Sequence, residues 1–137
     1  MTPTIRPAHV TEVLAVLGLW HEANAEPTHT DDEANLTKLL GQDPEAVIVA
    51  ESDGRIVGTV IAGWDGWRGS IYRLAVTPTH RREGLGRRLV RAAEERLADC
   101  GAVRLQAIVV ESDTQASGFW RASGWEQQTQ RLRFVKG

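Results

Sequence analysis

The sequence predicts a single mixed α/β domain of the α+β kind, spanning residues 1–137, and three observations carry that prediction. A chain of 137 residues suits one compact domain with one core. Apolar residues follow helical spacing in some stretches and strand-like patterns in others, which indicates interleaved helices and strands. Residues 70–110 read strand, helix, strand, a crossover that pairs its two strands in parallel. We expect a mixed, mostly antiparallel sheet of six to seven strands with about four helices.

The first half of the chain predicts one strand, two helices and a hairpin. The stretch TIRPA is a short strand that ends at Pro7. The stretch HVTEVLAVLGLWHEANA is a helix, because apolar residues recur at helical spacing at Val10, Val13, Leu14, Leu17 and Trp20. The stretch DDEANLTKLLGQ is a second helix, with acidic residues at its start and Gly41 near its end. AVIVAES and RIVGTVIAGW are strands joined at Asp53-Gly54, a strong hairpin signal.

The second half predicts two further helices and at least three strands. SIYRLAV is a strand that Pro78 ends, and from Gly84 to Gly101 the pattern becomes helical. VRLQAIVV is the next strand, and DTQASGFWRAS is a short helix that Gly124 closes. The alternation in WEQQTQRLRFVKG predicts one or two final strands.

Composition and charge narrow the functional class. The chain is 42% apolar and 25% charged, ordinary values for a globular protein. Its net charge of −2 provides no global positive field, so we expect no nucleic-acid partner. The single cysteine, Cys100, allows neither an intrachain disulfide nor a multi-cysteine metal site, and we expect no metal. With no run of about 18 apolar residues, we expect a cytoplasmic protein without a membrane partner.

The stretch VTPTHRREGLG, residues 76–86, joins the fourth strand to the next helix. The first backbone N–H groups of a helix lack internal partners and carry the positive end of the helix dipole, which attracts anions. Glycines let phosphate oxygens approach the backbone closely. Arg81, Arg82, Arg87 and Arg88 add positive charge. The pattern indicates a phosphate or pyrophosphate site, although alone it also fits a solvated arginine-rich turn; no Gly-Lys-Ser/Thr of a P-loop follows.

This stretch resembles the acetyl-CoA motif of the GNAT superfamily of N-acetyltransferases, V-x-P-x-x-R-x-x-G-x-G, at the end of the fourth strand. A second block, DTQASGFWRASGW, is similar to the superfamily's later motif, N-x-x-A-x-x-x-Y-x-x-x-G-F. The blocks stand in the family's order, separated by a helix and a strand. The resemblance implies the GNAT fold, in which parallel fourth and fifth strands splay apart to admit a thioester.

The resemblance also implies the cofactor contacts. The amides from Arg81 to Gly86 would hold the pyrophosphate of coenzyme A, while the backbone of Ala75 and Val76 would pair with the pantetheine arm. The N–H of Val76 would be the oxyanion donor. The implied cofactor residues are Leu74, Ala75, Val76, Arg81, Arg82, Glu83, Gly84, Leu85, Gly86, Arg87, Asp113, Ser117 and Trp120.

The implied reaction is direct transfer of an acetyl group from acetyl-CoA to a primary amine of a small molecule or peptide, through a ternary complex. Two positions depart from the family. Asp113 stands where the family has Asn, and we favour a helix N-cap role for it. Trp120 stands at the family's Tyr, the proposed proton donor, and an indole cannot serve as an acid at neutral pH. The alternative is therefore a catalytically weakened acyl-CoA-binding sensor or interaction domain.

The sequence identifies no general base. An alkyl amine with a pKa of about 10 must lose a proton before it attacks. Family members often carry a carboxylate on the fourth strand, where this chain has Tyr72 and Arg73. The remaining candidates are each more readily explained as solvated surface groups: Glu51, Asp65, Glu111, His21 and His29.

Three residues are expected near the acceptor: His29, Tyr72 and Trp64. His29 lies in AEPTHTDDE, between the first two helices, where family members usually place substrate-contacting residues. The acids of that stretch favour a cationic acceptor, although acids at a helix start explain them equally well. Trp64 and Trp67 flank Asp65-Gly66, a turn signal, and they fit a core cover, a substrate cleft or a contact in a possible homodimer.

Overall fold

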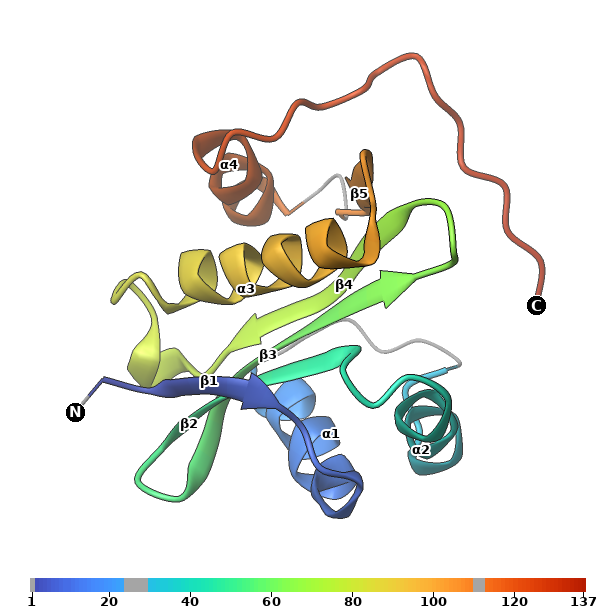
Figure 1. Cartoon of the computed structure of the whole chain (residues 1–137). Helices are drawn as coiled ribbons and strands as arrows, with labels where there is room; N and C mark the ends of the chain where they lie inside the picture. Colours follow the sequence, from blue (N-terminus) through green and yellow to red (C-terminus); the bar gives the residue numbers. More distant parts are fainter. Residues whose placement is uncertain (1, 24–29, 110–112) are drawn as a thin grey trace. The chain divides into compact units, whose positions relative to one another are not determined.

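The computed structural model describes residues 2–23, 30–109 and 113–137. These residues form two compact units, one up to Ala107 and one from Ile108 to Gly137 (Figure 1). The first unit contains the sheet and the helices α1, α2 and α3, and the second contains α4. No helix within the described ranges is long and apolar enough to cross a membrane.

The sheet follows chain order, β1-β2-β3-β4-β5. Its strands are β1 (Thr4–Pro7), β2 (Val47–Ser52), β3 (Arg55–Trp64), β4 (Gly69–Val76) and β5 (Leu105–Ala107). The pairs from β1 to β4 are antiparallel, and β4 and β5 are parallel, as the crossover predicted. Asp53 and Gly54 have φ of 52° and 75°, the left-handed geometry that a two-residue hairpin turn requires.

Helices cover both faces of this sheet (Figure 1). The helix α1 (Val13–Glu22) follows a short 3-10 turn, and α2 (Glu33–Gln42) lies with it on one face, whereas α3 (Leu85–Cys100) lies on the other. The side chain of Asp32 caps α2 by accepting a hydrogen bond from the amide of Asn35 at 2.8 Å. Gly101, with a φ of 105°, ends α3.

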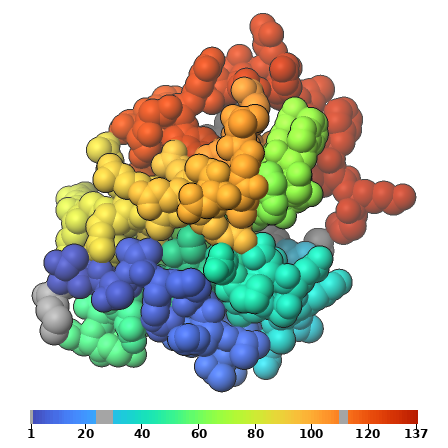
Figure 2. All heavy atoms as spheres, in the orientation of Figure 1, coloured from blue at the N-terminus to red at the C-terminus, as the bar shows by residue number. Residues whose placement is uncertain are grey.

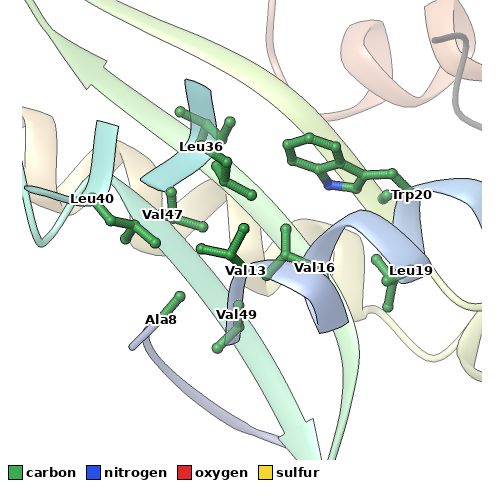
Figure 3. Packing of buried hydrophobic residues seen from close by; sticks show 11 residues of the cluster. Ala8, Val13, Val16, Leu19, Trp20, Leu36, Leu40, Val47 and Val49 are labelled. Atoms are coloured by element: carbon green, nitrogen blue, oxygen red, sulfur yellow. The ribbon is translucent and has the colours of Figure 1, made fainter. Parts of the chain in front are cut away.

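The two faces are packed in different ways. A cluster that includes Val16, Trp20 and Leu36 joins α1 and α2 to β2 and β3 (Figure 3). On the other face α3 comes close to the strands at two glycines. A Cβ on Gly58 would lie 2.9 Å from the side chain of Leu89, and one on Gly69 would lie 2.8 Å from that of Leu97. Because these glycines have no Cβ, α3 packs closely against β3 and β4.

Three expectations about the fold are corrected. The apolar face of α1 is formed by Val13, Val16, Leu19 and Trp20, whereas Val10 and Leu14 are 57% and 66% exposed. The strand expected over residues 103–110 is only Leu105–Ala107. Residues 125–137 form no strand, so the described residues contain five strands rather than six to seven. Alternation shows that a segment could form a strand, but a strand exists only where a neighbouring edge accepts its hydrogen bonds.

Candidate functional site

The second half of β4 has one open edge. The parallel pairing with β5 covers only Gly69–Leu105, Ser70–Gln106 and Ile71–Ala107. On its other edge β4 continues along β3 as far as Val76. In the described part of the chain, residues 72–76 therefore have no strand partner on the β5 side. An open strand edge is a surface on which an extended ligand can form backbone hydrogen bonds.

Val76 directs its backbone groups toward this open edge. Val76 lies opposite Gly58, and the next amide, Thr77, donates to the carbonyl of Val57 at 2.9 Å. This pattern makes Gly58 and Val76 a non-hydrogen-bonded pair, whose own N–H and C=O groups face away from each other. The same alternation turns the backbone groups of Ala75 toward β3.

A β-bulge lies just before these residues. Thr59 pairs with Ala75 and Ile61 with Tyr72, so Arg73 and Leu74 together oppose one residue of β3. Arg73 has a φ of 54°, a left-handed conformation that is rare for a long side chain. A bulge bends a strand and changes the direction of its side chains, and bulges are common beside active sites.

The loop after β4 is held tightly. The buried Thr77 places its hydroxyl 3.1 Å from His80 Nδ1, at the end of a 3-10 turn over Pro78–His80. Arg82 and Gly84 then adopt left-handed conformations, with φ of 65° and 77°. These two reversals bring the chain directly into α3 at Leu85, as the glycine pattern predicted.

The N-terminus of α3 is exposed and has no side-chain cap. Gly84 occupies the N-cap position without a side-chain hydrogen bond to the helix amides. The helices α2 and α4 differ, because Asp32 and Asp113 cap them. Uncapped amides at the positive end of a helix dipole form an anion site. Among the expected cofactor residues, Leu85 is buried in the seat of α3, Gly86 is half-buried, and Arg81, Arg82, Glu83, Gly84 and Arg87 are exposed.

Four arginines and one glutamate between residues 81 and 88 leave three net positive charges around this helix start. Arg81 folds back over the loop, with Nε donating to the Val76 carbonyl at 3.2 Å and Nη2 to the Ala23 carbonyl at 3.1 Å. Arg88 donates to the Pro3 carbonyl at 2.9 Å, where the N-terminal strand meets α3 (Figure 2). These side chains fix the loop to its neighbours while their charge stays beside the helix amides.

The second motif block has structural roles in its own unit. Asp113 accepts a hydrogen bond from the amide of Ala116 at 2.9 Å, so the expected N-cap of α4 (Thr114–Ala122) is confirmed. Trp120 packs edge-on against Phe119 and Trp125, with ring centroids 5.6 Å and 4.8 Å away. Ser117 is half-buried in the second turn of α4.

The candidate bases and acceptor residues are scattered. Glu51 pairs with Arg6 at 3.3 Å, and His21 is exposed at the end of α1. Asp65 accepts from the amides of Arg68 and Trp67 at 2.6 Å and 2.8 Å, and these hydrogen bonds lower the pKa of its carboxyl. His29 and Glu111 lie outside the described residues.

Two expected acceptor residues lie on neighbouring strands. Tyr72, on β4 where pairing with β5 has ended, is 48% exposed. Trp64 is half-buried at the end of β3. Trp67 is exposed in the turn that Asp65-Gly66 predicted, with the Arg68 guanidinium 4.1 Å above its ring. No three His, Cys, Asp or Glu side chains gather as metal ligands within residues 2–23, 30–109 and 113–137.

One polar group beside the bulge was not expected from the sequence. Thr59 is completely buried and bonds to Trp20 and Arg73. The signal was present, because Thr59 is the polar residue in the middle of the apolar run IVGTVIAG. The half-buried ion pair of Arg73 with Asp31 joins residues from β4 and from the segment before α2, and no sequence spacing indicated it.

Known proteins resemble this chain in sequence and in structure. The family model described as "Acetyltransferase (GNAT) family" matches residues 14–125. An acetyltransferase of Yersinia enterocolitica is 33% identical over 124 residues, covering 90% of this chain and 88% of the relative. The solved structure of Ard1 from Thermoplasma volcanium has a TM-score of 0.80 at 21% identity, covering 90% of this chain and 82% of that one.

A further solved structure contains the cofactor. The PaiA N-acetyltransferase of Thermoplasma acidophilum, in complex with coenzyme A, has a TM-score of 0.76 at 13% identity and covers 89% of this chain and 88% of its own. The structural likenesses show the GNAT fold, and the family model and the sequence relatives show the family. This chain therefore belongs to the GNAT family and is an N-acetyltransferase.

Proposed function

We propose that the protein transfers an acetyl group from acetyl-CoA to a primary amine of a small molecule or peptide by direct attack in a ternary complex. The observation that carries this proposal is the uncapped start of α3 immediately after the open edge of β4. The start of α3 offers backbone amides and positive charge to a pyrophosphate, and β4 offers an open strand edge to an extended arm. Coenzyme A has both groups in one molecule.

The described residues fit this cofactor. The left-handed conformations of Arg82 and Gly84 form a turn of the kind whose backbone amides hold phosphates. The pantetheine arm would lie along the open edge between Tyr72 and Val76. When bound, acetyl-CoA supplies the activated acyl group. Splaying of β4 from β5 beyond their last parallel pair, Ile71 and Ala107, is part of this proposal.

In the proposed reaction the amine nitrogen attacks the thioester carbon, the C–N bond forms, and the C–S bond breaks to release the thiolate. The N–H of Val76 faces the open edge, which supports it as the donor to the developing oxyanion. The amine gives up its proton to water or to a base still to be identified. A thiol with a pKa of about 8.5 can leave without full protonation, so a phenol at position 120 is dispensable.

The first experiment measures acetyl-CoA binding by titration calorimetry in two matched variants. Gly84→Glu places a carboxylate at the start of α3, and Gly101→Glu places one at its end. Both glycines are exposed, have left-handed φ, and would direct a Cβ into open space. We expect Gly84→Glu to weaken binding at least about 100-fold and Gly101→Glu to leave it within about twofold. Equal binding by the two variants would disprove the phosphate site.

The second experiment measures CoA release from acetyl-CoA over a panel of primary amines, including polyamines, amino acids and peptides. Acceleration by an amine supports transfer and identifies the acceptor class. Trp120 packs between Phe119 and Trp125 and carries no acidic group, which favours one alternative, an acyl-CoA-binding sensor with weakened catalysis. Tight binding without release for any amine would favour that alternative.

A further inference from the structure

We propose that a polar network of Trp20, Thr59, Arg73 and Asp31 holds the β4 bulge in the conformation that acetyl-CoA binding requires, with Arg73 as the central positioning residue. This inference rests on the proposed function, because it concerns how the pantetheine and acetyl groups are bound. The four residues come from α1, β3, β4 and the segment before α2.

One hydrogen bond from Thr59 holds the backbone of Arg73, and a buried hydrogen bond from Trp20 holds Thr59 in turn. The indole N–H of Trp20 donates to the hydroxyl of Thr59 at 2.8 Å, and this hydroxyl donates to the Arg73 carbonyl at 3.3 Å. Thr59 is 0% exposed and Trp20 5% exposed, so no solvent replaces either partner. Because the hydroxyl accepts one bond and donates the other, its orientation is fixed.

The side chain of Arg73 is held at the opposite end. Nε and Nη2 both bond to the carboxylate of Asp31, with Nε 3.1 Å from Oδ1. The guanidinium carbon lies 5.5 Å from the centre of the Trp20 ring. The two side chains are only 17% and 15% exposed, so the ion pair is shielded from water. A two-point contact of this kind fixes the orientation of an arginine as well as its position.

The bulge also determines which face Arg73 occupies. Ile61 belongs to the core under α1 and α2, and Gly63, two residues later, faces the same way. A Cβ on Gly63 would lie 3.2 Å from the Tyr72 ring, so Tyr72 is on this face too. Arg73 also contacts Trp20 of α1 on this face. Two consecutive side chains share a face of a strand only where a bulge interrupts the alternation.

The position of the bulge decides where Val76 directs its N–H. Side chains and backbone groups of a strand alternate with a period of two, so a slip of one residue exchanges inward and outward groups. Without the bulge, residues 74–76 would shift by one place along β3. The N–H of Val76 would then face β3, and the open edge would lose the proposed oxyanion donor. A left-handed φ at Arg73 costs free energy, and the network supplies the contacts that maintain it.

The test separates the two halves of the cofactor. Acetyl-CoA contacts both the bulged strand and the loop, whereas 3′-phospho-ADP has the pyrophosphate and no pantetheine arm. We expect Thr59→Val, Asp31→Asn and Arg73→Asn each to weaken acetyl-CoA binding by about tenfold and 3′-phospho-ADP binding by less than about twofold. Thr59→Ser retains the hydroxyl and should restore acetyl-CoA affinity.

The chain contains a matched control. Arg96 and Asp43 form a second half-buried ion pair, 2.5 Å apart, between α3 and the end of α2, away from the bulge. Asp43→Asn should leave both affinities unchanged. Thermal melts of each variant identify any that fail to fold, and Trp20→Phe, which keeps an aromatic ring in the core but removes the indole N–H, then takes the place of a failed variant.

Each result has a defined meaning. Loss of acetyl-CoA affinity alone, rescued by Thr59→Ser, supports the inference. Equal weakening of both ligands in the network variants, or no weakening of either, would overturn it while leaving the proposed cofactor intact. A wild-type protein that binds neither acetyl-CoA nor 3′-phospho-ADP would overturn the proposed function, and this inference with it.

Discussion

The two motif blocks of this chain use their residues in different ways. In the first, residues 76–86, the groups offered to a ligand belong to the backbone: the outward N–H of Val76 and the uncapped amides behind Gly84. In the second, residues 113–125, the side chains contact their own unit. Asp113 caps α4, and Trp120 packs between two aromatic rings.

This difference predicts which half of the proposed chemistry tolerates substitution. A backbone site depends on φ and on the position of a helix, so many side-chain changes leave it intact. A side-chain site depends on one functional group and is lost in a single substitution, which is what we propose for Trp120 at the position of the family's Tyr. We therefore expect cofactor binding to be the robust property of this protein and proton transfer the variable one.

The largest effect on stability should come from weakening the packing of α3 against β3, which supports the first motif block. Leu89 is completely buried and packs over Gly58, where it holds the first turns of α3 against β3. Leu89→Ala leaves a cavity and should lower the free energy of unfolding by about 3 kcal/mol, measured by urea denaturation. Leu14→Ala, at a site 66% exposed on α1, should cost less than about 0.5 kcal/mol. Similar losses of unfolding free energy in the two variants would show that α3 is not closely packed against β3.

Most of the fold was predictable because its signals are local. The left-handed pair Asp53-Gly54 and the helix start at Gly84 depend on a few neighbouring residues. The parallel pairing of β4 and β5 follows from the crossover between them. The prediction of one or two final strands was wrong, because alternation cannot show whether a neighbouring strand edge exists. Leu132 and Phe134 follow the alternating pattern, yet they are 85% and 88% exposed.

The candidate site likewise has one part that the sequence predicted and one part that it did not. The proposed phosphate-binding loop lies within one stretch of sequence, and the pattern of glycines and arginines predicted its helix start. The bulge at Arg73 has no glycine to mark it, because tertiary contacts with Thr59 and Asp31 maintain the left-handed φ. Contacts between residues 14 and 42 positions apart are not visible in one sequence. The general base was not found by either route.

Restoring the family's side chain in the second block tests whether proton transfer is the variable property. Trp120→Tyr supplies a phenol where the indole has only a non-acidic N–H. We expect kcat with the best amine acceptor to rise by about tenfold, the low end of what a general acid contributes, with acetyl-CoA affinity unchanged. An unchanged kcat in a folded variant would show that the thiolate takes its proton from water.

The role of Asp113 can be tested more simply. Asp113→Ala removes the N-cap and should destabilise α4 by about 1 kcal/mol. Asp113→Asn retains an oxygen that can accept the hydrogen bond, so it should cost only about 0.3 kcal/mol. Circular dichroism during denaturation measures the loss. Acetyl-CoA affinity should be equal in wild type and both variants. A drop in affinity with unchanged stability would instead make Asp113 a cofactor ligand.

The smallest expected effect concerns Glu12, a carboxylate that, like Asp113, stabilises the fold. Glu12 accepts two hydrogen bonds from Arg6, at 2.9 Å and 2.7 Å, and one from the amide of His9 at 2.8 Å. The bonds from Arg6 are the main reason that the pKa of Glu12 is lowered to about 2. A carboxyl with a lowered pKa in the folded state stabilises the fold above its unfolded pKa, about 4.5, and loses this contribution as the pH falls toward 2.

Because the Arg6–Glu12 pair is partly exposed, its contribution should be about 1 kcal/mol or less. The free energy of unfolding, measured by urea denaturation between pH 5 and pH 2, should therefore fall less steeply in Glu12→Gln than in wild type. Near pH 2 the two curves should converge, since wild-type Glu12 is then also becoming neutral. Acetyl-CoA affinity at pH 7 should be the same in both proteins, because Glu12 supports the β1 edge of the sheet and not the open edge of β4. Parallel curves over the whole range would show that Glu12 titrates alike in the folded and unfolded chains.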